Sequence, residues 1–215
     1  AQNIKAFAEN IDLSANNSIK LAVSGGTNLI KNSGNHPSTA GWSTWSSGGG
    51  ETLVVATNRT PPNTQNALRI THNANNDDVF LSQSVNQLAF NEGDVYTLSF
   101  LSHGWTANYY VDATVADANS QNQVLNFGRM RQQRLVGSGF YYYEATATVP
   151  PGAIQNTPFL RLVFSQDTPD RWITNIKLEK GSAATDWSPS PFDPASGVKT
   201  SKIEIGSDFI DIESG

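Results

Sequence analysis

The sequence predicts an all-β protein, an antiparallel β-sandwich of the jelly-roll type, with short β-rich flanking arms at both termini. Apolar residues recur with a period of two in several runs, while helical spacing is scarce. Turn-forming residues separate these runs at short intervals, as in all-β sandwiches. The clearest turn signals are Gly25-Gly26, Ser47 to Gly50, Pro61-Pro62-Asn63, Asn73 to Asp78, Asn91 to Gly93, Gly137 to Gly139, Pro150 to Gly152 and Asp167 to Asp170.

Five runs carry the strand alternation most clearly. In residues 95–101, Tyr96, Leu98 and Phe100 alternate with small polar residues, which predicts one buried and one wetter face. In the run 172–178, Ile176 and Leu178 share a face, and Trp172 has the same parity. We expect further strands at 109–115, 143–149 and 159–164.

The domain organisation follows from where the apolar residues lie. Residues 26–193 hold nearly all the large apolar residues and are predicted to form one domain. The arms, residues 1–25 and 194–215, have too little apolar mass to fold alone, so we expect each to pair with the other or with a parent protein. The chain begins at Ala1 without a basic, apolar leader, which favours a piece cut from a longer polypeptide.

Composition excludes several classes of function. Only 15% of the 215 residues are charged, and the net charge of −5 disfavours nucleic acid and anionic membranes as partners. The absence of cysteine removes disulfides, thiolate metal sites and cysteine nucleophiles. The three histidines lack zinc-site spacing. We therefore expect no cofactor.

Several segments, in this order along the chain, resemble a known family. They are Thr27 to Ser33, Gly41-Trp42, Ala67 to Ile70, Gly93 to Phe100, Trp172 to Gly181 and Ala184-Thr-Asp-Trp-Ser-Pro-Ser-Pro191. Together they resemble the jelly-roll carbohydrate-binding modules embedded in tail-tip and baseplate proteins of long-tailed phages that infect Gram-positive bacteria. The closing stretch from Leu178 to Pro189 is the most specific.

The resemblance implies a viral protein of the phage tail, located in the virion, with both arms belonging to the parent tail protein. It implies binding to host cell-wall polysaccharide during host recognition and adsorption, and contact with other tail or baseplate subunits. The matching motifs support the fold and name no sugar-contacting residue. Such modules often carry a structural calcium, for which 73–78 and 117–121 offer oxygen ligands, although turn chemistry explains both stretches.

The candidate site is predicted from strand parity. A sugar receptor needs flat aromatic rings flanked by hydrogen-bonding groups. Burying the apolar set of each strand leaves one outer face that carries Trp105, Tyr110, Tyr142, His103, Asp112, Glu144 and Arg161. A slip of one residue would instead turn Tyr141 and Tyr143 outward. Trp45 lies in a Ser/Gly-rich stretch and is a candidate for a loop site, whereas Trp42, Trp172 and Trp187 are expected to be structural.

A second candidate is the cationic run that contains Arg129, Arg131 and Arg134. Guanidinium groups suit carboxylates or phosphates of cell-wall polymers, and Arg129 and Arg131 share a face. The alternative is an edge strand guarded by charge against pairing with another chain.

No catalytic signature is present in the sequence. Hydrolysis of glycosides needs two carboxylates across a cleft, and the spacing of residues such as Asp112 and Glu144 establishes no such pair. We therefore predict a binding module that is not an enzyme. The alternatives are a glycan-degrading or enzyme-appended module and a ligand-free decoration of the tail.

Overall fold

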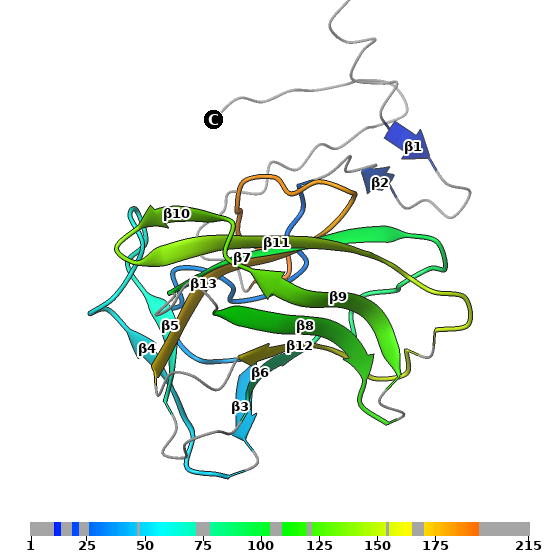
Figure 1. The fold of residues 1–215 in the computed structure, drawn as a ribbon. Coiled ribbons are helices and arrows are strands. Elements are labelled where there is room, and N and C mark those ends of the chain that lie inside the picture. Colours follow the sequence, from blue (N-terminus) through cyan, green and yellow to red (C-terminus); the bar gives the residue numbers. More distant parts are fainter. Residues whose placement is uncertain are drawn as a thin grey trace, which may run out of the picture.

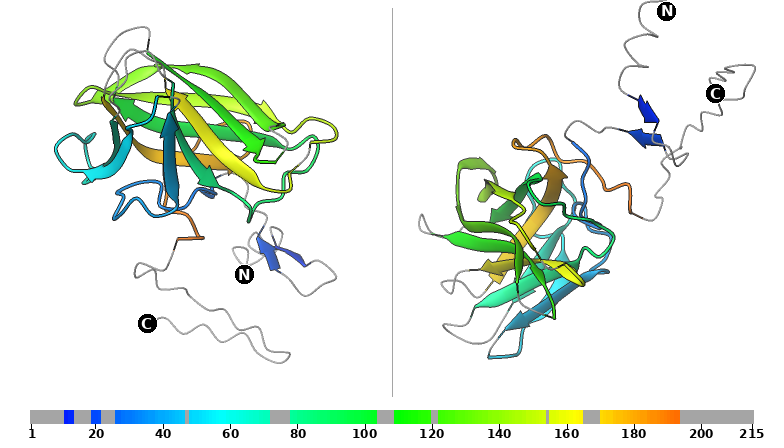
Figure 2. Two further views of the ribbon diagram at one scale, coloured as in Figure 1. Left: turned by 90° about the horizontal axis from the view of Figure 1, so that it is seen from below. Right: turned by 90° about the vertical axis from the view of Figure 1, so that its right-hand side faces the viewer.

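Two antiparallel sheets packed face to face form a β-sandwich, as the sequence predicts (Figure 1). The computed structural model describes residues 11–13, 19–21, 26–46, 48–71, 78–103, 109–119, 122–153, 155–164 and 170–193. The views in Figure 2 show the same two layers from below and from the right. These residues include no helix that could cross a membrane.

The six-stranded sheet has the order β10-β11-β7-β13-β5-β4. Its strands are β10 (Arg134–Gly137), β11 (Phe140–Thr148), β7 (Val95–His103), β13 (Asp170–Lys180), β5 (Ala67–Thr71) and β4 (Thr52–Ala56). Strands distant in the sequence lie side by side in this sheet. Its middle therefore depends on long-range pairing between β7, β11 and β13.

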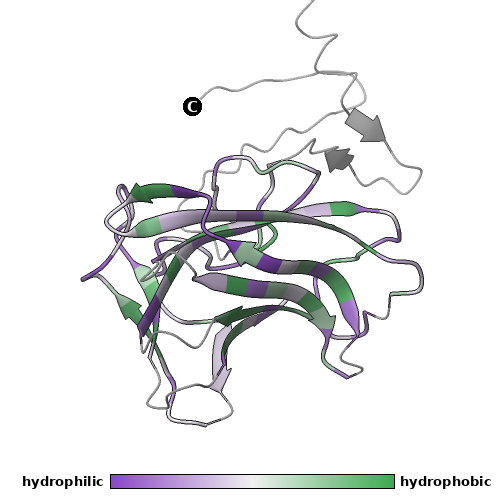
Figure 3. Cartoon of the chain, in the orientation of Figure 1, coloured by the Kyte–Doolittle hydropathy of each residue, from purple (hydrophilic) through white to green (hydrophobic). Residues whose placement is uncertain are grey.

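The five-stranded sheet has the order β3-β6-β12-β8-β9. Its strands are β3 (Trp42–Ser46), β6 (Val79–Ser84), β12 (Pro158–Phe164), β8 (Tyr110–Asp117) and β9 (Gln123–Arg131). All the predicted strand runs are present. The alternating hydropathy of β8 and β9 is visible in Figure 3.

The hydrophobic core lies between the sheets and uses the alternation in each strand. Tyr96, Leu98 and Phe100 of β7 are buried in it, as predicted. Tyr143 stacks on Phe100 with ring centroids 4.9 Å apart, whereas Tyr142 faces away from the core. The predicted register of the aromatic run is therefore confirmed.

A β-bulge in β13 corrects the parity predicted for Trp172. The pairing with β7 shifts between Thr174 and Lys177, and Asn175 adopts a positive φ of 52°. Ile173 therefore joins Ile176 in the core, while Trp172 is buried on the outer side of the sheet against Ala56, Ala67 and Phe140.

Hydrogen bonds join the opening segment of the domain, residues 26–33, to its closing segment, residues 176–193, and we call this set of contacts the clasp. Asn28 is fully buried, and its side-chain Nδ2 donates to Ser33 Oγ at 2.8 Å, to the Ile176 carbonyl at 3.1 Å and to the Ser188 carbonyl at 2.9 Å. Asp193 Oδ1 accepts a bond of 2.6 Å from the Asn32 amide. The opening and closing motifs noted in the sequence therefore join the first and last segments of the domain.

A buried polar network fastens the loop after β13 to the sheet. Lys177 Nζ lies 3.5 Å from Glu179 Oε1, and both side chains are about 1% exposed. The Lys177 ammonium also donates to Thr185 Oγ1 at 2.6 Å and to the Asp186 carbonyl at 2.7 Å. Glu179 accepts bonds from the Thr185 amide and hydroxyl at 2.8 and 2.9 Å. The charges are thus paired and hydrogen-bonded, as burial requires.

The arms lie mostly outside the described residues. Two short strands, β1 (Ile11–Leu13) and β2 (Ile19–Leu21), pair antiparallel within the N-terminal arm. The arm boundaries at 25 and 194 remain predictions.

Candidate functional site

The predicted outer face divides into two faces on opposite sides of the sandwich. Tyr110, Asp112 and Arg161 lie on the outer face of the five-stranded sheet. Tyr142 and Glu144 lie on the outer face of the six-stranded sheet. The prediction of one shared face is wrong because parity identifies the outward residues of a strand but not the sheet that the strand joins.

A row of side chains crosses the whole outer face of the five-stranded sheet. The pairing registers place in line one residue from each strand: Trp45, Phe80, Val163, Asp112 and Arg129. At a strand spacing of about 4.8 Å, such a row is roughly 19 Å long. We call it the five-strand row.

The β3 end of the five-strand row is aromatic. Trp45 is 57% exposed and lies on β3, not in a loop. Its ring centroid is 5.2 Å from that of Phe80, with 44° between the planes. Arg161 Cζ lies 5.8 Å from the centroid of Phe80. This end offers a flat ring beside a guanidinium.

The β9 end is cationic. Arg129 Cζ lies 3.8 Å above the Tyr110 ring, and its Nε is 3.5 Å from Asp112 Oδ1. Arg131 pairs in register with Tyr110 on the same face. The described part of this face therefore carries three arginines, Arg129, Arg131 and Arg161, and one aspartate, although the net charge of the whole chain is −5. Both sequence interpretations of Arg129 and Arg131 are compatible with their place, because β9 is also an edge strand.

His103 is buried rather than outward and open: its Nε2 lies 2.7 Å from Arg59 Nη1, and its ring contacts Phe140 and Trp172. Burial, together with the Arg59 charge, lowers the pKa of His103 to about 4. Trp105 lies outside the described residues, in the segment between β7 and β8.

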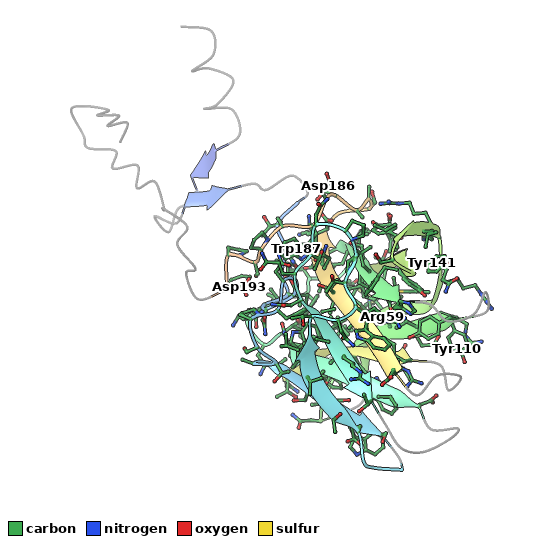
Figure 4. The ribbon with its side chains drawn as sticks, turned by 90° about the vertical axis from the view of Figure 1, so that its left-hand side faces the viewer. Arg59, Tyr110, Tyr141, Asp186, Trp187 and Asp193 are labelled. Carbon is green, nitrogen blue, oxygen red and sulfur yellow. The ribbon has the colours of Figure 1, made fainter. Side chains whose placement is uncertain are left out.

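The outer face of the six-stranded sheet holds a cavity of about 420 Å³ that the sequence does not reveal. It lies between the β10–β11 hairpin and the loop after β13, and Tyr142 and Glu144 line it. The Tyr142 hydroxyl donates to Glu144 Oε2 at 3.0 Å. Burial raises the pKa of Tyr142 to about 12, and the bond to Glu144 adds to this. Figure 4 shows Asp186 and Trp187 of the loop well apart from Tyr110.

Asp112, Asp117 and Glu144, which were considered for metal binding or hydrolysis, can be placed in the structure, whereas residues 73–77 of the other calcium candidate lie outside the described residues. The Asp117 carboxylate accepts a bond of 3.0 Å from the Asn119 amide, which is turn chemistry, and a long-range bond of 2.8 Å from the Thr157 amide. Asp112 and Glu144 lie on opposite sides of the sandwich. In the described ranges, no group of three or more His, Asp or Glu side chains could hold a metal ion.

The two packed antiparallel sheets and the clasped first and last segments define a jelly-roll β-sandwich, an architecture found in carbohydrate-binding modules. No protein-family model matches the sequence, and no curated protein does.

Solved structures share the fold. The CBM22-1 xylan-binding domain of Paenibacillus barcinonensis Xyn10C is 14% identical, with a TM-score of 0.53, over 76% of this chain and 100% of that domain. The enzymatically active domain of bacteriophage CBA120 tailspike protein 4 is 18% identical, with a TM-score of 0.55, over 72% of this chain but only 21% of the tailspike chain. A cyclase from Fischerella sp. is 15% identical, with a TM-score of 0.53, over 76% of this chain and 100% of its own. These likenesses establish the fold alone.

Proposed function

We propose that the domain is a non-catalytic carbohydrate-binding module that binds a polysaccharide across the outer face of its five-stranded sheet. The five-strand row carries this proposal, because it combines an exposed tryptophan at its β3 end with the hydrogen-bonding side chains of Asp112 and Arg129 at its β9 end. An extended open row suits the interior of a polymer chain better than a single small ligand.

The charge of the face indicates the kind of polymer. Three arginines and one aspartate flank the aromatic rings, so the face suits a polysaccharide with carboxylate or phosphate substituents. The rings supply stacking, which is insensitive to salt, whereas exposed guanidinium contacts are screened as salt rises.

The biological setting we propose is a phage tail. The module would belong to a tail-tip or baseplate protein in the virion, contact other tail subunits and bind host cell-wall polysaccharide of a Gram-positive bacterium during adsorption. The closing motif supports this setting, and the fold shared with a phage tailspike domain is compatible with it. Several copies on one tail would raise a weak affinity per module by avidity.

Labelling of cells tests the function directly. A fluorescent fusion of the full chain is expected to label Gram-positive cells, and purified cell-wall polysaccharide is expected to compete with the label. Trp45→Ala should remove most of the labelling, whereas Phe192→Ala, which truncates another exposed aromatic residue away from the row, should not.

Three measurements, of salt dependence, of reducing ends and of labelling itself, separate the alternatives. Labelling that persists at about 0.5 M salt indicates stacking, and labelling lost there indicates capture by the arginines. Release of reducing ends from the polysaccharide would favour a glycan-degrading module. An intact fold that labels no susceptible host would favour a ligand-free decoration of the tail.

A further inference from the structure

We infer that the cavity on the six-stranded sheet is a second carbohydrate site, one that takes a single terminal sugar unit rather than the interior of a polymer. The inference rests on the proposed function only for the class of ligand. Its residues are separate from the five-strand row, because the two sites lie on opposite faces of the sandwich.

The cavity has a floor and two walls that differ in origin. Ser99 and Leu101 of β7 form the floor with Tyr142 and Glu144 of β11. The β10–β11 hairpin supplies one wall and the loop after β13 the other. Its volume of about 420 Å³ falls in the range of small-molecule sites.

Both walls are held in place without a ligand. The Gln133 side chain donates to the Glu144 carbonyl at 2.9 Å, and Arg134 Cζ lies 4.4 Å above the Tyr142 ring. On the other side, Trp187 Nε1 donates to Ser33 Oγ at 3.2 Å. A Cβ at Gly34 would lie 2.5 Å from the Trp187 ring, so only glycine lets the ring pack there. The site is therefore preorganised, which lowers the entropic cost of binding.

The polar groups of the cavity match a sugar. Glu144 and Asp186 offer carboxylate oxygens to ligand hydroxyls, while Arg134 and Ser99 offer donors. Arg134 has no ion pair with any described residue, and Trp187 adds an aromatic surface. Two carboxylates against one cation disfavour phosphate or other anions. The mixed donors and acceptors therefore favour a neutral hydroxyl-rich unit, and the walls limit its length.

The test is an NMR titration of the full-length chain with methyl glycosides of neutral hexoses and N-acetylhexosamines. We expect saturable shifts of the Ser99, Ala184 and Thr185 amides, with dissociation constants on the order of 1 mM, for at least one glycoside. Glucuronate should bind at least several-fold more weakly, because its carboxylate meets Glu144 and Asp186.

Two substitutions of equal size give the matched comparison. Glu144→Gln and Asp186→Asn should each weaken binding about tenfold, which is the loss of one charge-assisted hydrogen bond. Asp186 holds Lys177 through its backbone carbonyl, so Asp186→Asn leaves that bond in place. The control, Glu92→Gln, changes an exposed turn outside the cavity and should bind like the parent chain.

The outcomes distinguish this site from the five-strand row. Trp45→Ala should leave the titration unchanged even where it abolishes cell labelling. The inference is overturned if no glycoside shifts these amides up to about 50 mM. It is also overturned if Glu144→Gln and Asp186→Asn bind as the parent chain does.

Discussion

Two tryptophans on one strand show how position alone decides whether a side chain is buried or exposed. Trp42 and Trp45 both lie on β3, but they point to opposite faces of the sheet. Trp42 is 6% exposed and donates through Nε1 to the Asn32 carbonyl at 2.7 Å, whereas Trp45 is 57% exposed. The same side chain therefore serves the core at one position and the candidate site at the other.

We expect Trp42→Ala to lower the free energy of unfolding by about 3 to 5 kcal/mol, as for other buried aromatic residues. Trp45→Ala should change it by less than about 1 kcal/mol, because most of its ring stays in water in the folded state. Chemical denaturation of both variants measures the difference. A large loss of stability in Trp45→Ala would assign this residue to the core and weaken the proposed face.

A buried histidine predicts how stability depends on pH. Burial lowers the pKa of the fully buried His36 to about 4, below its ordinary value of 6.5. The unfolded chain therefore takes up a proton at this residue before the folded chain does. The contribution to stability is complete above pH 6.5 and declines as pH falls toward 4.

Between pH 7 and pH 5 we expect His36 to reduce the free energy of unfolding by about 2 kcal/mol. Denaturation of the parent and of His36→Asn at both pH values measures this term. The variant should be less stable at pH 7 but should lose less between the two values. Equal losses in both proteins would mean that His36 titrates normally in the fold.

Among the elements of the fold, the loop after β13 depends most on buried charge. Lys177→Met would leave the Glu179 carboxylate buried without its cation, so we expect a loss of about 3 to 5 kcal/mol. Adding Glu179→Gln should recover part of this loss, because the neutral amide needs no counterion. Denaturation of the two single variants and the double variant measures the coupling. Additive effects would show that the pair does not interact energetically.

The strands show which features a sequence can predict. Parity is local, so the alternation in β11 was enough to place Tyr143 in the core and Tyr142 outside. Sheet membership is not local: β7 pairs with β11 and β13, far along the chain, while β8 joins the other sheet. For this reason parity alone predicts one face for Tyr110 and Tyr142, although they lie on different sheets. The bulge at Asn175, which reverses the parity of Trp172, has no signal in the alternation itself.

The sequence does not predict the cavity, because the position of its walls also depends on contacts between distant segments. One wall comes from residues 133–136 and the other from residues 184–187, which lie far apart in the sequence. The closing motif indicates only that the loop after β13 is structural. Asp186 and Trp187 in that motif are the residues from which a site could have been suspected.

At the scale of the whole molecule, residues 26–193 contain both sheets, the core and the clasp. We expect this segment, without either arm, to unfold in one cooperative thermal transition and to keep both proposed binding sites. Calorimetry measures the transition, and a fragment with no cooperative transition would show that an arm belongs to the fold. The full chain is the control.

The clasp also determines how the domain can be joined to other chains. The Ser188 hydroxyl donates to the Gly26 carbonyl at 3.3 Å, so the polypeptide enters and leaves the sandwich at neighbouring points. A carrier protein could therefore accept the domain within a surface hairpin without separating the two hairpin strands, since inserted domains are tolerated when their ends are close. Binding would then be gained by interrupting one loop of the carrier, with no change to the carrier's own core.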